Sequence, residues 1–223
     1  MAEFERRALM KGAALGALAF TVGGTTVMLT AGQARARNVP FRMLNENEAD
    51  TIAALGETLV PGARNAGIAH FIDLQISVPP EEALLQARIL HVRPPFVNFY
   101  RAAIGAVDRA SDKIHGLKFA QLSTGTQREF VGLMRLNKIE VWQGPPGGFV
   151  YTVLRADAVD VVYSTMEGYE ALGVPYMAHI APERRCVAVG HRVRGARAHD
   201  RAAMQMRLRH HRAAARPDLL GLG

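Results

Sequence analysis

Side chains able to bind metal or to catalyse are scattered along this chain, and one short spacing pairs two of them. Asp112 and His115 stand three residues apart in a segment expected to be helical, which resembles the Glu-x-x-His pairs of helical di-metal sites. Such a site requires a second pair and two further carboxylates, and no second Asp/Glu-x-x-His occurs in the sequence. The spacing therefore does not predict a metal site.

Other reactive residue types lack the context that their chemistry requires. Ser164 is not flanked by the glycines of a nucleophile elbow, and the adjacent Glu81 and Glu82 suit the first turn of a helix better than an acid–base pair. No Cys-x-x-Cys-His or Gly-x-Gly-x-x-Gly motif is present, and Cys186 is the single cysteine. We therefore predict no catalytic, cofactor-binding or metal residue on this chain.

The N-terminus carries the pattern of a twin-arginine export signal. Arg6 and Arg7 are followed by Leu9 and Lys11, and then by an uncharged stretch of twenty residues from Gly12 to Ala31. Ala34 and Ala36 provide a small-x-small peptidase site, so residues 1–36 are predicted to be a cleaved signal for transport of folded cargo to the periplasm. An uncleaved anchor is the alternative, because twenty helical residues span about 30 Å.

The positive charge of the chain is concentrated at its C-terminus. Residues 183–223 contain ten Arg against three acidic residues, which accounts for the whole net charge of +7. Residues 1–182 carry equal numbers of basic and acidic residues, and this balance does not suggest a nucleic-acid-binding domain. Rich in Arg, Ala and Gly without an apolar stripe, the tail is predicted to be disordered. A basic arm for anionic lipid and a frameshifted C-terminus are two other interpretations.

Residues 37–182 are predicted to form an all-α domain, an irregular bundle of five or six helices. Asn45 and Glu48 form a capping box before a helix that ends at Pro61-Gly62, and a second helix around Ile68–Ile76 ends at Pro79-Pro80. Further helices are expected from Glu81 to about Leu90, from Phe96 to His115, from Ser123 or Thr124 to about Asn137, and from Phe149 to Tyr163. No persistent alternation of apolar and polar residues predicts a sheet.

Aromatic residues gather in the Gly- and Pro-interrupted final third of this domain. Trp142, Tyr169 and Tyr176 are candidate anchors for a partner, because large aromatic side chains on irregular backbone bury much area at low rotamer cost. They could equally close the core over the helices.

Three segments of the chain resemble one protein family. Leu44 to Pro61, followed by Gly62, Ala69 and Phe71-Ile72-Asp73, is similar to the opening of the gluconate 2-dehydrogenase subunit 3 family. Two later parts are similar to the middle and the end of that family, namely Phe119–Ser123 with Gln127-Arg128, and Tyr163 with Gly168-Tyr169 and Leu172–Tyr176. With the signal included, the likeness spans about Arg6 to Arg185.

The resemblance implies a non-catalytic small subunit that accompanies a large FAD-binding subunit oxidising a sugar or polyol. A multihaem cytochrome c subunit, carrying haem c, often completes such complexes at the inner membrane. The small subunit would lend its twin-arginine signal to the large one, so the translocase is a further expected partner, whereas nucleic acid is not. An autonomous exported helical enzyme or metal-binding protein is the alternative, and a membrane-anchored structural protein is a third possibility.

Overall fold

The computed structural model describes residues 18–22 and 24–173, all within the first of the two units, Met1–Ala178 and His179–Gly223, into which the chain divides. The predicted tail, 183–223, lies outside the described residues. The described part contains strands β1 (Leu18–Val22) and β2 (Thr25–Leu29) and helices α2 (Ala31–Ala36), α3 (Glu46–Leu59), α4 (Ile68–Ser77), α5 (Gln86–Ile89), α6 (Phe96–His115), η1 (Phe119–Gln121), α7 (Thr124–Arg135), α8 (Gly147–Tyr163) and α9 (Met166–Ala171).

The long helices begin and end where their local signals predict. The Asn45 side chain accepts from the backbone N–H of Glu48 while the Glu48 carboxylate accepts from that of Asn45, so the predicted capping box starts α3. Gly116 ends α6 with a left-handed φ of 70°, a conformation in which glycine avoids the steric cost of a Cβ. The fold class is thus confirmed as predominantly helical, with five helices of ten residues or more in the described part.

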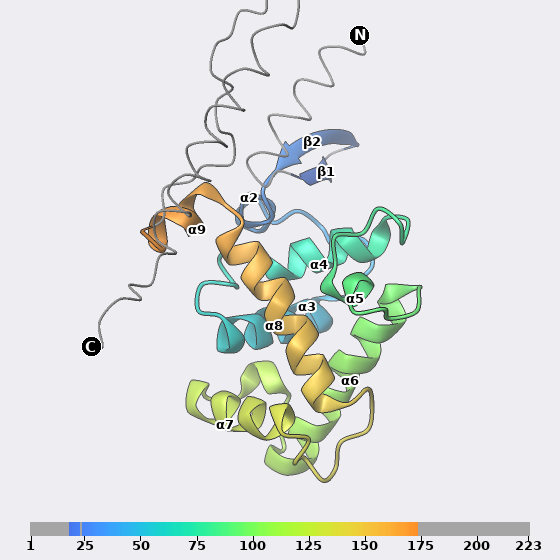
Figure 1. The fold of residues 1–223 in the computed structure, drawn as a ribbon, viewed down its shortest axis with the longest axis vertical. Helices are drawn as coiled ribbons and strands as arrows, with labels where there is room; N and C mark the ends of the chain where they lie inside the picture. The colour runs from blue at the N-terminus through green and yellow to red at the C-terminus, as the bar shows by residue number, and fades with distance from the viewer. Residues whose placement is uncertain (1–17, 23, 174–223) are drawn as a thin grey trace, which may run out of the picture. The chain divides into compact units, whose positions relative to one another are not determined.

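The core is built around α3 and α8. Figure 1 shows α8 crossing α3 and α4, with α7 near its N-terminal end and α9 at its C-terminal end. Apolar residues on α8 are fully buried against the other helices, among them Val150, Val153 and Leu154. Helix α6 also packs into the core, because Phe96, Tyr100 and five further apolar positions of that helix are buried.

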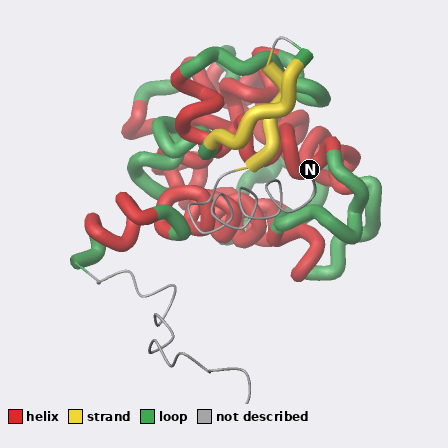
Figure 2. The backbone as a smooth tube through the Cα atoms, turned by 90° about the horizontal axis from the view of Figure 1, so that it is seen from above, coloured by secondary structure: helices red, strands yellow, loops and turns green. Residues whose placement is uncertain are grey.

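The N-terminal segment, before the predicted helical domain, contains a β-hairpin that the sequence did not predict. Strands β1 and β2 pair antiparallel with Leu18 opposite Leu29 and Val22 opposite Thr25, and Gly24 between them has a φ of 81°. Figure 2 shows this hairpin at the edge of the helices. Threonine and valine favour strands, and glycine favours tight hairpin turns, so the Thr, Val and Gly residues of this uncharged stretch favour a hairpin.

Two helix predictions were wrong in extent. The helix expected from Glu81 contains only Gln86–Ile89, because residues 81 and 82 form a turn, residues 83–85 are irregular, and Leu85, not a carboxylate, is the N-cap of α5. The helix from Thr124 ends at Arg135, and Asn137 lies beyond it with a φ of 55°. Leu133 on this helix is exposed, whereas Phe130 and Met134 are buried.

Candidate partner-binding pocket

A large pocket opens between the N-terminal segment, α5 and the C-terminal end of α8. Its volume is about 1070 Å³, slightly above the usual range of about 300–1,000 Å³ for small-molecule pockets. The N-terminal side is formed by Leu18, Thr30, Ala31, Gly32, Gln33 and Ala36; the opposite side is formed by Ala83–Gln86, Arg88, Ile89, His91, Asp160–Val162, Ser164, Thr165, Gly168 and Ala171; and Asn65, Ala66 and Phe71 complete the lining. Most of this surface is apolar.

Two large apolar side chains stand exposed at the edge of the pocket. Leu84 is 58% exposed and Ile89 is 61% exposed, although the adjacent Leu85 and Ala87 are fully buried. The buried pair anchors this short segment, and the backbone N–H of Leu84 donates to Oε1 of Gln75 at 2.8 Å. The segment is therefore held with Leu84 and Ile89 toward solvent. Exposed apolar side chains beside an apolar pocket are typical of a surface that another molecule covers.

A buried carboxyl group connects the pocket to the core. Asp157 on α8 is fully buried, and its Oδ1 accepts from the backbone N–H of Gln86 at 2.9 Å while its Oδ2 lies 2.5 Å from the Tyr100 hydroxyl. Burial raises the pKa of Asp157 to about 7, against the opposing effect of these hydrogen bonds. Burial and the nearby carboxyl also raise the pKa of the Tyr100 hydroxyl well above its ordinary value.

One turn further along α8, Asp160 completes this polar group. Its Oδ2 accepts from the Gln86 side-chain amide at 2.5 Å, so Asp157 and Asp160 together hold the start of α5 against α8. Gln86 and Asp160 both line the pocket. The position of the exposed Ile89 thus depends on hydrogen bonds that begin at the buried carboxyl of Asp157.

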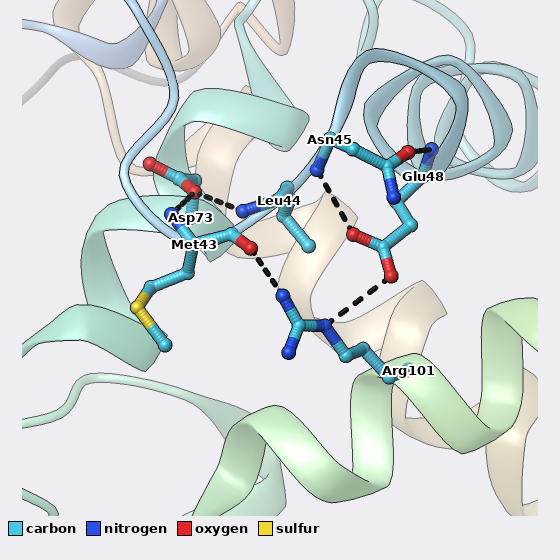
Figure 3. Close-up of polar contacts among 6 residues, drawn as sticks. All are labelled: Met43, Leu44, Asn45, Glu48, Asp73 and Arg101. Atoms are coloured by element: carbon cyan, nitrogen blue, oxygen red, sulfur yellow. Dashed lines mark hydrogen bonds and ion pairs between the residues drawn. The ribbon is translucent and has the colours of Figure 1, made fainter.

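The Asp73 carboxylate fixes the segment that joins α2 to α3 (Figure 3). It accepts three backbone N–H groups, at 2.8 Å each, from Arg42, Met43 and Leu44. Bonds from several amides to one buried carboxylate are charge-assisted and strong. Arg101 contacts the same segment by donating to the Met43 carbonyl, and its Nε lies 3.3 Å from Glu48 Oε1. Asp73 and Arg101 therefore hold the N-terminal segment against α4 and α6.

His70 binds the same segment at Val39, three residues after the end of α2. Its Nε2 lies 3.0 Å from the Val39 carbonyl oxygen, its ring packs on Phe41 with centroids 4.6 Å apart, and Nδ1 has no hydrogen-bond partner among the described residues. Burial lowers the pKa of His70 below its ordinary value of 6.5. The neutral ring with its proton on Nε2 satisfies the carbonyl, so His70 serves here as a hydrogen-bond donor from the core.

The gluconate 2-dehydrogenase subunit 3 family model matches residues 46–178, from the start of α3 to beyond α9. The chain belongs to this family. Its membership confirms the resemblance seen in the sequence and implies a larger catalytic partner in a multi-subunit dehydrogenase. No curated relative and no solved structure matches the chain. The family match includes the α5–α8 side of the pocket, whereas Leu18 and the residues of α2 lie upstream of it.

The three predicted aromatic anchors are not among the residues that line the pocket as described. Trp142 lies before α8, is partly buried against the core, and donates from Nε1 to the Pro145 carbonyl oxygen at 2.7 Å. Tyr169 belongs to α9, but its side chain is outside what the structure describes, and Tyr176 lies beyond the described residues. None of the three lines the pocket as described, so docking by these residues stays a prediction.

Of the predicted export residues, the structure describes only the two at the peptidase site. Arg6, Arg7, Leu9 and Lys11 lie outside the described residues. Ala34 and Ala36, the predicted peptidase site, both belong to α2, where Ala34 is fully buried and Ala36 lines the pocket. The sequence did not reveal the pocket, because its walls come from segments that are more than a hundred residues apart along the chain, such as α2 and α9.

Within residues 18–22 and 24–173, no three His, Cys, Asp or Glu side chains come together as a metal site would require. Over the same ranges, no helix combines the length and the apolar character needed to cross a bilayer.

Proposed function

We propose that this chain is the non-catalytic small subunit of a heteromeric FAD-dependent dehydrogenase of a sugar or polyol. It escorts the large FAD-binding subunit through the twin-arginine route and supports its folding and assembly. Family membership over residues 46–178 carries the proposal, because the family is defined as one subunit of a gluconate dehydrogenase. In the complex, FAD belongs to the large subunit and haem c to a cytochrome c subunit, and the assembly sits on the periplasmic face of the inner membrane.

The export step rests on the residue pattern at the N-terminus. Arg6 and Arg7 with Leu9 and Lys11 match a twin-arginine signal, and this route moves proteins that are already folded. A large subunit without a signal of its own would cross the membrane only while bound to this chain. The escort therefore requires a complex that forms before export and survives transport.

The large subunit binds over the pocket between α2, α5 and α8 in this proposal. Full burial of an aliphatic side chain contributes about 1.5–3 kcal/mol, so covering Leu84 and Ile89 provides a substantial part of the binding free energy. The partner surface that fits is an apolar segment, because the pocket walls are mainly apolar. Arg88, His91 and Asp160 at the pocket offer polar contacts that would orient such a segment.

Docking is tested by co-purification of the large subunit with matched aspartate variants. Ile89→Asp introduces a charge at the pocket edge, whereas Ile114→Asp introduces the same charge at a residue of α6 that is 48% exposed and does not line the pocket. Loss of an anchor costs about 2 kcal/mol, or roughly thirtyfold in affinity. We expect that loss for Ile89→Asp only, with unchanged melting of both free variants. Equal affinity for the two variants would refute docking at this pocket.

Export is tested by replacing Arg6 and Arg7 with lysine in cells that express both subunits. The double variant should retain both chains in the cytoplasm, because the pair is the recognised part of the signal. Normal dehydrogenase activity in the periplasm of that variant would contradict the escort. The rival, an autonomous exported enzyme or metal-binding protein, predicts flavin or haem absorbance or bound metal in the chain purified alone.

A further inference from the structure

We propose that residues 18–36 remain on the exported chain, because Ala34 of the small-x-small peptidase site is buried in the folded chain and the bond after the exposed Ala36 lies in a hydrogen-bonded helix end. This proposal about signal-peptide cleavage rests on the proposed twin-arginine export. Cargo of this route is folded before a peptidase on the far side of the membrane meets it, so the accessibility of the site in the folded chain decides whether it is cut.

The peptide bond that would be cut, between Ala36 and Arg37, lies at the end of a helix with caps at both ends. At the start of α2, the Thr30 side chain accepts from the backbone N–H of Gln33, and the Gln33 side chain accepts from that of Thr30. A protease must draw several residues on each side of the bond into an extended conformation. Capping at the start of this short helix opposes that opening.

The far end of α2 is closed by three further backbone hydrogen bonds. The N–H groups of Arg37, Asn38 and Val39 donate to the carbonyls of Gln33, Arg35 and Ala34 at 3.1, 3.0 and 3.0 Å. Asn38 has a φ of 50°, the left-handed conformation of a Schellman cap, which asparagine tolerates better than most residues. The residues after the bond are therefore as firmly bonded as those before it, and Val39 also holds His70.

Packing buries the first of the two small residues. Ala34 is fully buried in a second apolar cluster with Phe20, Leu29, Val39 and Leu74. Phe20 and Leu29 come from the hairpin and Leu74 from α4, so the cluster joins the N-terminal segment to the helical bundle. A signal peptidase recognises both small side chains of its site, and the Ala34 methyl group reaches solvent only if α2 leaves α4.

The turn before α4 is shaped to receive α2. Gly67 has a φ of 83°, and a Cβ at this position would lie 2.2 Å from the Ala31 carbonyl oxygen and 2.7 Å from the Gly32 nitrogen. Only a residue without a side chain permits this approach. Gly62 in the same loop has a similar φ of 94°, but a Cβ there would meet nothing within 4 Å. A substitution at Gly67 therefore combines backbone strain with a clash against α2, whereas the same substitution at Gly62 causes the backbone strain alone.

Removal of residues 1–36 would alter more than the terminus. The second cluster would lose Phe20, Leu29 and Ala34, which leaves Leu74 and Val39 without most of their neighbours. The pocket would lose the wall formed by Leu18, Thr30–Gln33 and Ala36. Retention therefore preserves both a part of the core and the shape of the proposed docking site.

The decisive experiment exposes the purified full-length chain to signal peptidase in detergent micelles, with a synthetic peptide of residues 28–43 as the substrate without tertiary structure. We expect rapid cutting of the peptide after Ala36 and an intact folded chain, because proteolysis of a folded site follows the population of its open form. Cutting of the folded chain at the rate of the peptide would overturn the proposal.

Matched variants identify the packing that protects the site. Gly67→Ala should increase cutting of the folded chain by about tenfold over Gly62→Ala, since a change of about 1.4 kcal/mol in opening corresponds to a factor of ten and only Gly67→Ala displaces α2. Should Gly67→Ala fail to fold, Thr30→Val, which removes the N-cap of α2, should still increase cutting by about fivefold. Cutting of both tested variants at the rate of Gly62→Ala would count against protection by α2.

Mass spectrometry of the chain recovered from the periplasm completes the test in cells. A chain that contains residues 18–36 supports retention, and a chain that begins at Arg37 overturns it without affecting the export proposal. A chain that stays in the cytoplasm would instead contradict the export proposal. The assay on the purified chain would still decide whether the folded site resists signal peptidase.

Discussion

Replacing Asp157 with asparagine is expected to remove a large pH-dependent loss of folding stability. The carboxyl group keeps its proton in the folded chain up to a pKa of about 7, whereas in the unfolded chain it ionises near its ordinary value of 3.8. Between these two values the folded state binds more protons than the unfolded state, so the free energy of unfolding falls as the pH rises. Below pH 3.8 the group is neutral in both states and contributes no pH dependence.

The magnitude follows from the gap between the two values. Each pKa unit corresponds to 1.36 kcal/mol, so ionisation of Asp157 lowers the stability at pH 8 by about 4 kcal/mol relative to pH 3.8. Asparagine keeps an oxygen for the Gln86 N–H and offers an N–H to the Tyr100 oxygen, and it therefore imitates the protonated acid. The variant should lack this loss, so its stability relative to the natural chain should rise from pH 3.8 and reach its full gain above about pH 7.

The assay is urea unfolding of the full chain followed by far-UV circular dichroism at several pH values from 4 to 8. The quantity compared is the difference in unfolding free energy between Asp157→Asn and the natural chain, since it cancels the other titrating groups. Asp50→Asn, at an exposed aspartate of α3, is the matched control. Parallel pH profiles of Asp157→Asn and the natural chain would refute a neutral buried carboxyl at this position.

Three further substitutions test the described contacts by urea unfolding. Asp73→Asn should lower stability by about 2–4 kcal/mol because it weakens three charge-assisted hydrogen bonds, whereas Asp50→Asn on the exposed side of α3 should change it by less than about 0.5 kcal/mol; similar losses would contradict the role of Asp73. Gly144→Ala should cost about 1–3 kcal/mol because its Cβ would lie 2.6 Å from a side chain of α6, while Gly132→Ala within α7 has open space and should gain about 0.5–1 kcal/mol; the reverse order would refute the packing. Trp142→Ala should lower the stability of the free chain by about 2 kcal/mol with unchanged affinity for the large subunit, and a loss of affinity alone would instead identify it as an anchor.

The parts of the fold that the sequence predicts correctly depend on signals close together along the chain. The capping box of Asn45 and Glu48 needs residues three apart, and the end of α6 needs only Gly116 after a helical stripe. The hairpin was missed because its Gly-Gly and Thr-rich strands lie within a stretch that also fits a signal peptide. The helix expected from Glu81 was too long because buried Leu85 and Ala87, and their contacts with α8, outweigh the preference of carboxylates for a first turn.

The pocket and its supports could not be predicted in the same way, because their contacts join distant residues. Asp73 accepts from amides about thirty residues upstream, and Asp157 accepts from Gln86, seventy-one residues away. A lone Asp in an apolar helix gives no sign of its partner. Trp142, Tyr169 and Tyr176 were selected by residue type alone, whereas Leu84 and Ile89 became candidates only when the structure showed them exposed beside a cavity.

The two walls of the pocket come from different parts of the chain, so the choice of partner subunit could change in evolution through one wall alone. One wall lies within the family domain, but the wall from α2 lies before residue 46, where the family match begins. Recombination that exchanges only the N-terminal segment between paralogues would therefore reshape the pocket while leaving α3 and α8 intact. A chimera with a foreign N-terminal segment joined at residues 42–44, which Asp73 binds, would reveal whether partner choice is inherited with that segment or with the family domain.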